Sequence, residues 1–85
     1  YWQMRFKTLR AELQGLKDRL GEKRERMKEF RRRWLVTQKR SERQLLNQIE
    51  EEIAKDEERI KDVERQLDEL DVEAARNAVP LEWRQ

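Results

Sequence analysis

Apolar side chains recur at alternating spacings of four and three residues through residues 2–34, WQMRFKTLRAELQGLKDRLGEKRERMKEFRRRW. Nine of the ten positions in this seam are apolar, and the exception is Lys23. A repeat kept over several heptads predicts a helix that packs along a narrow apolar stripe, as in a coiled coil. We therefore expect a helix over about residues 2–37, with a core seam of Trp2, Phe6, Leu9, Leu13, Leu16, Leu20, Met27, Phe30 and Trp34.

The same rhythm returns between residues 46 and 74, where eight of nine seam positions are apolar and Asp56 is the exception. This pattern predicts a second helix over about residues 42–78, which Pro80 brings to an end. Residues 79–85 then form a tail. The second core seam consists of Leu46, Ile49, Ile53, Ile60, Val63, Leu67, Leu70 and Ala74.

The two seams are out of phase, and residues 37–44 between them contain no apolar side chain. Ser41 followed by Gln44 fits a capping box, in which both side chains satisfy free amide groups at the start of a helix. We therefore expect a turn at about residues 38–41 and a helical hairpin. The alternative is one long helix with a break in the heptad phase, two of which would form an extended antiparallel homodimer.

Charge favours antiparallel packing in either case. Residues 1–40 carry 14 Lys/Arg against 5 Asp/Glu, a net charge of +9, whereas residues 41–85 carry 7 against 14, a net charge of −7. Like charges beside a seam oppose pairing, so the basic half belongs next to the acidic half. The positions flanking the two seams pair with residue numbers that sum to 81: Arg10 with Asp71, Lys17 with Glu64, Arg24 with Glu57 and Arg31 with Glu50.

The two polar interruptions, Lys23 and Asp56, fall in adjacent layers of this antiparallel register. We expect them to meet and to fix the register, because slipped alignments would separate them. At the other end, Leu81 and Trp83 are expected to fold back near Trp2 and Phe6. The alternative is that they form a segment that binds a partner.

Composition excludes several classes of function. Of the 85 residues, 47% are charged, and the chain contains neither His nor Cys. The common transition-metal sites and the Ser-His or Cys-His nucleophiles therefore lack their residues. Gly15 and Gly21 stand alone, so no Gly-rich phosphate loop is present. We predict no enzyme, no cofactor, no metal site and no catalytic residue.

The predicted function is structural: a coiled-coil module for protein–protein interaction, which assembles with a protein partner or with a second copy as a homodimer. A nucleic acid or another phosphate surface is the alternative partner, because the bend carries cations that the register leaves free: Lys28, Arg32, Arg33, Lys39, Arg40 and Arg43. The third alternative is the soluble part of a membrane-tethered protein, since Tyr1 suggests a piece of a longer chain with an anchor before it. The compartment stays open, with a cytoplasmic one favoured.

Overall fold

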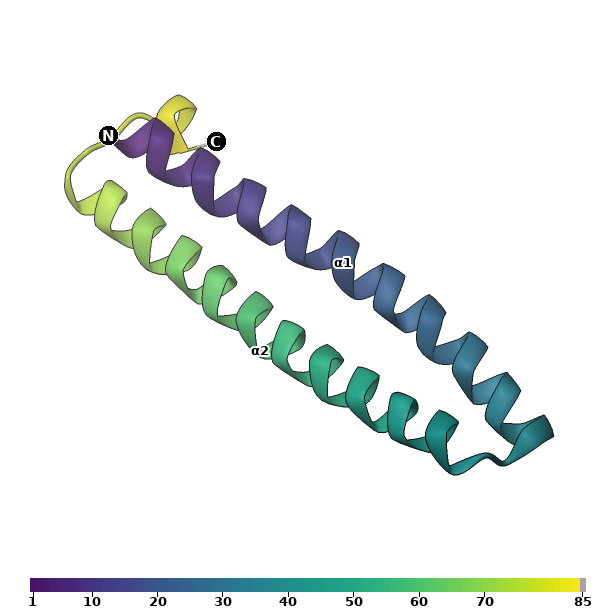
Figure 1. Ribbon diagram of the computed structural model, residues 1–85. Coiled ribbons are helices and arrows are strands. Elements are labelled where there is room, and N and C mark those ends of the chain that lie inside the picture. Colours follow the sequence, from purple (N-terminus) through teal and green to yellow (C-terminus); the bar gives the residue numbers. More distant parts are fainter. Residues whose placement is uncertain (85) are drawn as a thin grey trace.

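The chain is an all-α helical hairpin. The computed structural model describes residues 1–84, with helix α1 over Trp2–Thr37, helix α2 over Arg40–Arg76 and a short 3-10 helix, η1, over Leu81–Arg84. The two long helices lie side by side in opposite directions, which brings the tail back beside the start of α1 (Figure 1). The hairpin measures 60 × 15 × 14 Å. Because the chain reverses after Thr37, the alternative of one continuous long helix does not apply.

The reversal uses only two residues outside the helices. Gln38 adopts the left-handed conformation, with φ of 51°, and its N–H donates to the Trp34 carbonyl oxygen at 2.7 Å. Lys39 is extended, and α2 begins at Arg40, two residues earlier than expected. Such a left-handed residue at the end of a helix stops it and turns the chain away.

The predicted capping box is wrong. Ser41 lies inside the first turn of α2, and the residue in the capping position is Lys39, whose side chain makes no capping hydrogen bond. A different polar contact joins the two helix ends, where the Thr37 hydroxyl donates to the Glu42 carboxylate. Glu42 is also the acidic residue of the first turn, where the helix dipole favours a negative charge.

The second helix also ends two residues before the predicted boundary. Ala78 takes a left-handed conformation, with φ of 54°, and Val79 donates its N–H to the Ala74 carbonyl oxygen at 2.9 Å. Together with the bond from the Ala78 N–H to Ala75, this is the Schellman arrangement that satisfies free carbonyls at a helix end. The buried Val79 side chain then adds an apolar contact beneath the turn. This turn therefore ends helix α2 at Arg76, before the chain reaches Pro80.

The core is a single file of apolar side chains between the helices. All the predicted seam residues are buried or half-buried. Burial is uneven, however, because no residue of α1 after Leu20 is fully buried. Towards the bend, Met27, Phe30 and Trp34 are only half-buried, and Leu46 is buried outside the main cluster. The main cluster consists of Phe6, Leu9, Leu16, Leu20, Ile53, Ile60, Val63, Leu70, Ala74 and Val79.

Candidate interaction surfaces

The structure brings the two polar seam residues together. The Lys23 Nζ lies 2.8 Å from the Asp56 Oδ2 and 3.8 Å from the Glu52 Oε2. The side chains of Lys23 and Asp56 are less than a quarter exposed, so their charges attract each other with limited screening by water. No polar or charged residue is fully buried among residues 1–84. This pair is therefore the main polar link across the seam.

Of the four flanking pairs, one is formed. The Arg24 Nη2 lies 3.0 Å from the Glu57 Oε1, as the constant sum of residue numbers requires. Lys17 and Glu64 line the same open groove but make no ion pair within 4.0 Å in the described part of the chain. The pair of Arg31 with Glu50 is not formed either, since the Arg31 Nη2 lies 3.9 Å from the Met27 sulfur and Glu50 makes no ion pair within residues 1–84.

The fourth flanking pair is displaced by the tail. Arg10 and Asp71 line one shallow groove, yet neither is bonded to the other. The Arg84 Nη1 instead lies 3.2 Å from the Asp71 Oδ1, and the Arg10 guanidinium donates to the Arg84 carbonyl oxygen. The predicted contact between Arg10 and Asp71 is thus bridged by Arg84. Sequence numbering alone treats the two helices as isolated and gives the tail no role.

A second contact between helices was not predicted. The Glu12 carboxylate accepts a hydrogen bond from Arg59 Nε at 3.0 Å, although the antiparallel register of the two seams sets Arg59 opposite Arg19. Glu12 lies one heptad before Arg19, on the same side of the seam. A long arginine side chain can reach a carboxylate displaced along the helix axis, and repulsion from Arg19 favours that choice. A search for the opposite charge one heptad away would have found this pair.

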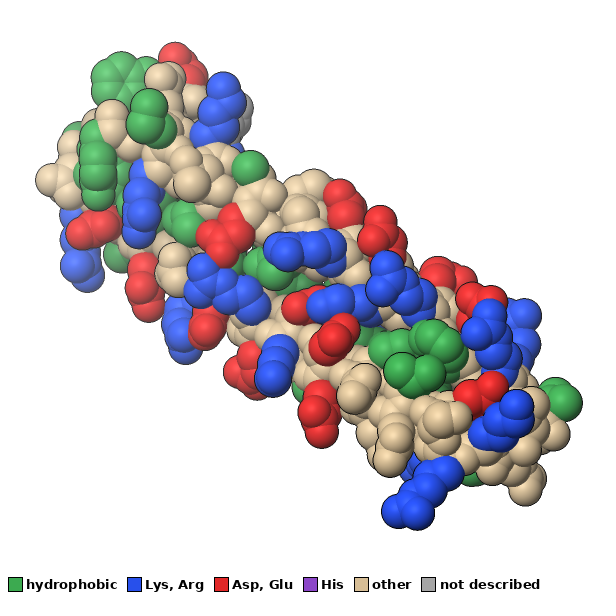
Figure 2. All heavy atoms as spheres, viewed as in Figure 1, with side chains coloured by type: hydrophobic (Ala, Val, Ile, Leu, Met, Phe, Trp, Pro, Cys, Tyr) green, Lys and Arg blue, Asp and Glu red, His purple; other side chains and the backbone are tan. Residues whose placement is uncertain are grey.

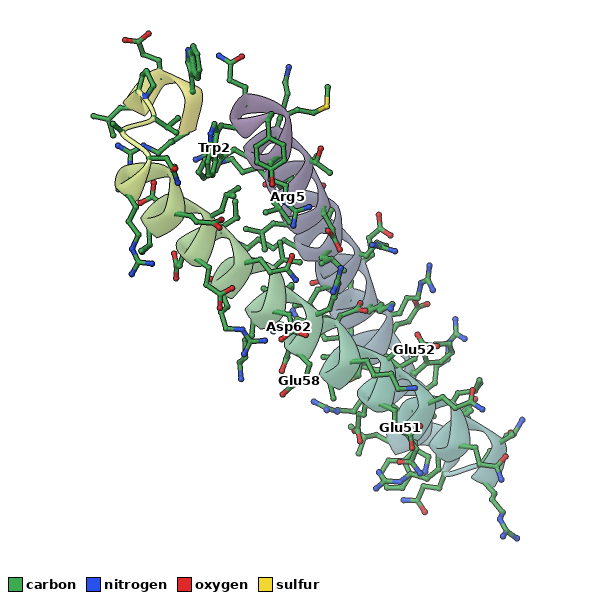
Figure 3. All side chains as sticks on the ribbon, turned by 90° about the vertical axis from the view of Figure 1, so that its left-hand side faces the viewer. Trp2, Arg5, Glu51, Glu52, Glu58 and Asp62 are labelled. Atoms are coloured by element: carbon green, nitrogen blue, oxygen red, sulfur yellow. The ribbon has the colours of Figure 1, made fainter. Side chains whose placement is uncertain are left out.

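The tail is ordered, but not by the residues expected to anchor it. Helix η1 packs against α1, and its anchors are the buried Val79 and the largely buried Arg84 side chain. The tail folds back beside the start of α1 as expected, but Leu81 is 70% exposed and Trp83 is 46% exposed, so these two side chains do not enter the core. In Figure 3, Trp2 lies at this open end, beside the tail. The open-end surface comprises the exposed side chains Tyr1, Met4, Leu81 and Trp83.

Near the bend, part of the predicted basic patch is already engaged. Lys28 pairs with Glu25 at 3.2 Å, and Arg33 pairs with Glu29 at 2.9 Å. The Arg43 guanidinium covers the Trp34 ring, 5.2 Å from its centre. Within residues 1–84, three members of the patch are exposed and make neither an ion pair nor a contact with an aromatic ring: Arg32, Lys39 and Arg40.

Two surfaces of the bend half expose apolar side chains. The first, which we call the bend-half surface, is the incompletely covered seam with its neighbour, consisting of Met27, Phe30, Trp34, Leu45 and Ile49. The second is the tip surface, where exposed aliphatic and basic side chains of the end of α1, the turn and the start of α2 are combined: Arg32, Leu35, Val36, Lys39 and Arg40. Figure 2 shows apolar side chains reaching the surface near the bend, with Lys and Arg side chains around them.

Features of two other kinds are absent from the described residues. Residues 1–84 contain no group of three or more acidic side chains placed to hold a metal ion. Neither long helix has a stretch apolar enough to cross a membrane, in the part of the chain that is described. Comparison with protein-family models, with curated proteins and with solved structures gives no match.

Proposed function

We propose that this hairpin is a protein–protein interaction module that assembles with a second copy of itself through the bend-half surface. The observation that carries the proposal is the half-buried state of Met27, Phe30 and Trp34. These are seam residues, yet a single opposing helix leaves them partly in water. Small helical scaffolds with a thin core gain stability from oligomerisation, because a second copy completes the cover.

The exposed Leu45 side chain in the bend-half surface supports a dimer in which both copies use the same surface. Leu45 is 40% exposed and directly precedes the buried seam residue Leu46 on α2, in the half of the hairpin that also contains Phe30 and Trp34 of α1. A two-fold axis near this point sets the same apolar patch of both copies face to face. Two hairpins joined in this way form a four-helix bundle, which buries the seam on both sides.

Charge supports the same arrangement. In Figure 3, the side chains of Glu51, Glu52, Glu58 and Asp62 follow one another along α2. The bend half of α1 carries the excess of cations. Antiparallel bundles place α2 of one copy beside α1 of the other, so the acidic helix of each copy meets the basic helix of its partner.

Sedimentation velocity from micromolar to submillimolar protein tests this proposal. We expect a concentration-dependent rise from one chain to two. Substitution Leu45→Gln should raise the dissociation constant roughly tenfold or more, because each copy loses an apolar contact in the interface. Leu45 is exposed in the single hairpin, so its substitution should leave the helix content unchanged by circular dichroism.

Val72→Gln is the matched control. Val72 is also an exposed apolar residue of α2, 52% exposed, but it lies far from the bend. Its substitution should leave self-association unchanged. A wild-type chain that stays single across the whole concentration range would refute the proposal, as would equal effects of the two substitutions.

A further inference from the structure

We propose that the tip surface docks peripherally onto an anionic lipid membrane, with Leu35 and Val36 entering the interface and Arg32, Lys39 and Arg40 contacting lipid phosphates. This function is separate from self-association, because Leu35 and Val36 do not belong to the bend-half surface. Self-association is measured without lipid, so either proposal can fail without the other.

The apolar part of the tip is exposed to an unusual degree. Leu35 is 63% exposed and Val36 is 86% exposed, and both lie in the last turn of α1, next to the chain reversal. No other described segment covers them. Adjacent aliphatic side chains at the end of a rigid rod are placed to enter a surface end-on, and the hairpin is 60 Å long but only 15 × 14 Å across.

Cations lie on both sides of these two residues in the sequence. Arg32 lies three and four residues before Leu35 and Val36, and therefore on the same outer face of α1. Lys39 lies in the turn, three residues after Val36, and Arg40 is the first residue of α2. All three cations are exposed and make no ion pair in the described part of the chain, so they are available to lipid phosphates.

This combination fits a membrane better than a nucleic acid. Basic side chains serve both, but aliphatic side chains contribute nothing to phosphate contacts and gain free energy in the acyl boundary of a bilayer. Base stacking needs a free aromatic face, and in the bend half Arg33 lies over the Phe30 ring at 5.4 Å and Arg43 over the Trp34 ring at 5.2 Å. The charge complementarity with an anionic leaflet and the exposed aliphatic pair therefore favour lipid.

Co-sedimentation with vesicles tests the proposal. We expect wild-type protein to bind vesicles of phosphatidylcholine mixed with phosphatidylserine and not vesicles of phosphatidylcholine alone. Replacing Arg32→Gln together with Arg40→Gln should weaken binding roughly 30-fold. Replacing Leu35→Ser together with Val36→Ser should weaken it by about tenfold or more. The control pair Lys55→Gln and Lys61→Gln removes two exposed cations of α2 away from the tip and should change binding little.

Tryptophan fluorescence locates the contact. The chain has three Trp residues, of which Trp34 lies near the bend and Trp2 and Trp83 lie at the open end. In a variant with Trp2→Phe and Trp83→Phe, the remaining emission should shift to the blue on addition of anionic vesicles. Absence of vesicle binding by the wild type would overturn the proposal. It would also be overturned if Leu35→Ser with Val36→Ser left binding intact while a single-stranded oligonucleotide bound equally well, since the tip would then bind polyanions in general.

Discussion

Lys23 and Asp56 show how single residues control this hairpin. Each interrupts an otherwise apolar seam, and their charged groups lie 2.8 Å apart, largely shielded from water. Removing a charge from water has a cost that the partner must offset, so the pair adds little net stability. Its value lies in register, because a shift along the helices leaves both charges partly buried without a partner.

Replacing one residue of this pair should therefore lower the free energy of unfolding more than replacing both. We expect Asp56→Ala to lower the free energy of unfolding by about 1–3 kcal/mol, because the Lys23 ammonium group is then left in the seam with only Glu52 nearby. The double replacement Lys23→Leu with Asp56→Leu should restore or exceed wild-type stability. Urea denaturation followed by circular dichroism measures both. Equal stability of Asp56→Ala and wild type would contradict the role assigned to the pair.

For the exposed residues that flank the seam, the antiparallel register predicts individual ion pairs less well. Arg24 meets Glu57 as the register requires, but Arg31 rests near Met27, and Arg59 reaches Glu12 one heptad along the axis. Exposed pairs contribute about 0.2–1 kcal/mol, which is too little to select one partner among several carboxylates within reach. Sequence charge therefore predicts which helices pair and in which direction, but not each contact.

At the scale of the elements, the ends of the helices depend on backbone conformation. Gln38 and Ala78 both adopt positive φ, at 51° and 54°, although neither is Gly. The apolar period predicted the start and end of α1, since a seam only requires the right side chains at the right spacing. It missed the Schellman turn at Ala78, because the usual signal for that turn is Gly or Asn at the left-handed position.

The turn offers a direct test. Gln38→Gly should raise the free energy of unfolding by about 0.5–1 kcal/mol, since Gly enters the left-handed region without a clash of its Cβ. Ser41→Ala should change it little, because the Ser41 side chain caps no helix in the structure. Thermal denaturation of both variants provides the comparison. A large loss of stability in Ser41→Ala would show that the capping box forms after all.

The two glycines inside α1 provide a second test at this scale. Beyond the adjoining backbone of α1 itself, a Cβ added to Gly15 or Gly21 would meet no heavy atom within 4 Å, so a methyl group has room at both positions. Each replacement by Ala should raise the free energy of unfolding by up to about 1 kcal/mol through helix propensity. Scanning calorimetry should show the two increments adding, because the sites are separate in sequence and share no partner. A lower melting temperature for either variant would contradict this expectation.

For the whole molecule, the segregation of charge predicted the fold more firmly than any motif. A basic first half and an acidic second half lie together in any antiparallel arrangement, within one chain or between two, and the structure shows the arrangement within one chain, a hairpin. The sequence could not predict the fate of the tail, because Arg84 is anchored by a carboxylate and a guanidinium that come from different helices. Nor could it show how poorly the bend half is covered, since seam periodicity is equally strong near Trp34 and near Phe6.

The most direct test of self-association between whole hairpins is the solution mass of a hairpin locked within one chain. The protein has no native Cys, so Arg24→Cys with Glu57→Cys can be joined by a short bifunctional thiol reagent at low protein concentration. Purified single chains carrying the cross-link are then sedimented at high concentration. We predict twice the chain mass of 10.6 kDa, because whole hairpins associate through the bend-half surface. A mass of one chain at every concentration, or cross-links formed only between chains, would contradict this prediction.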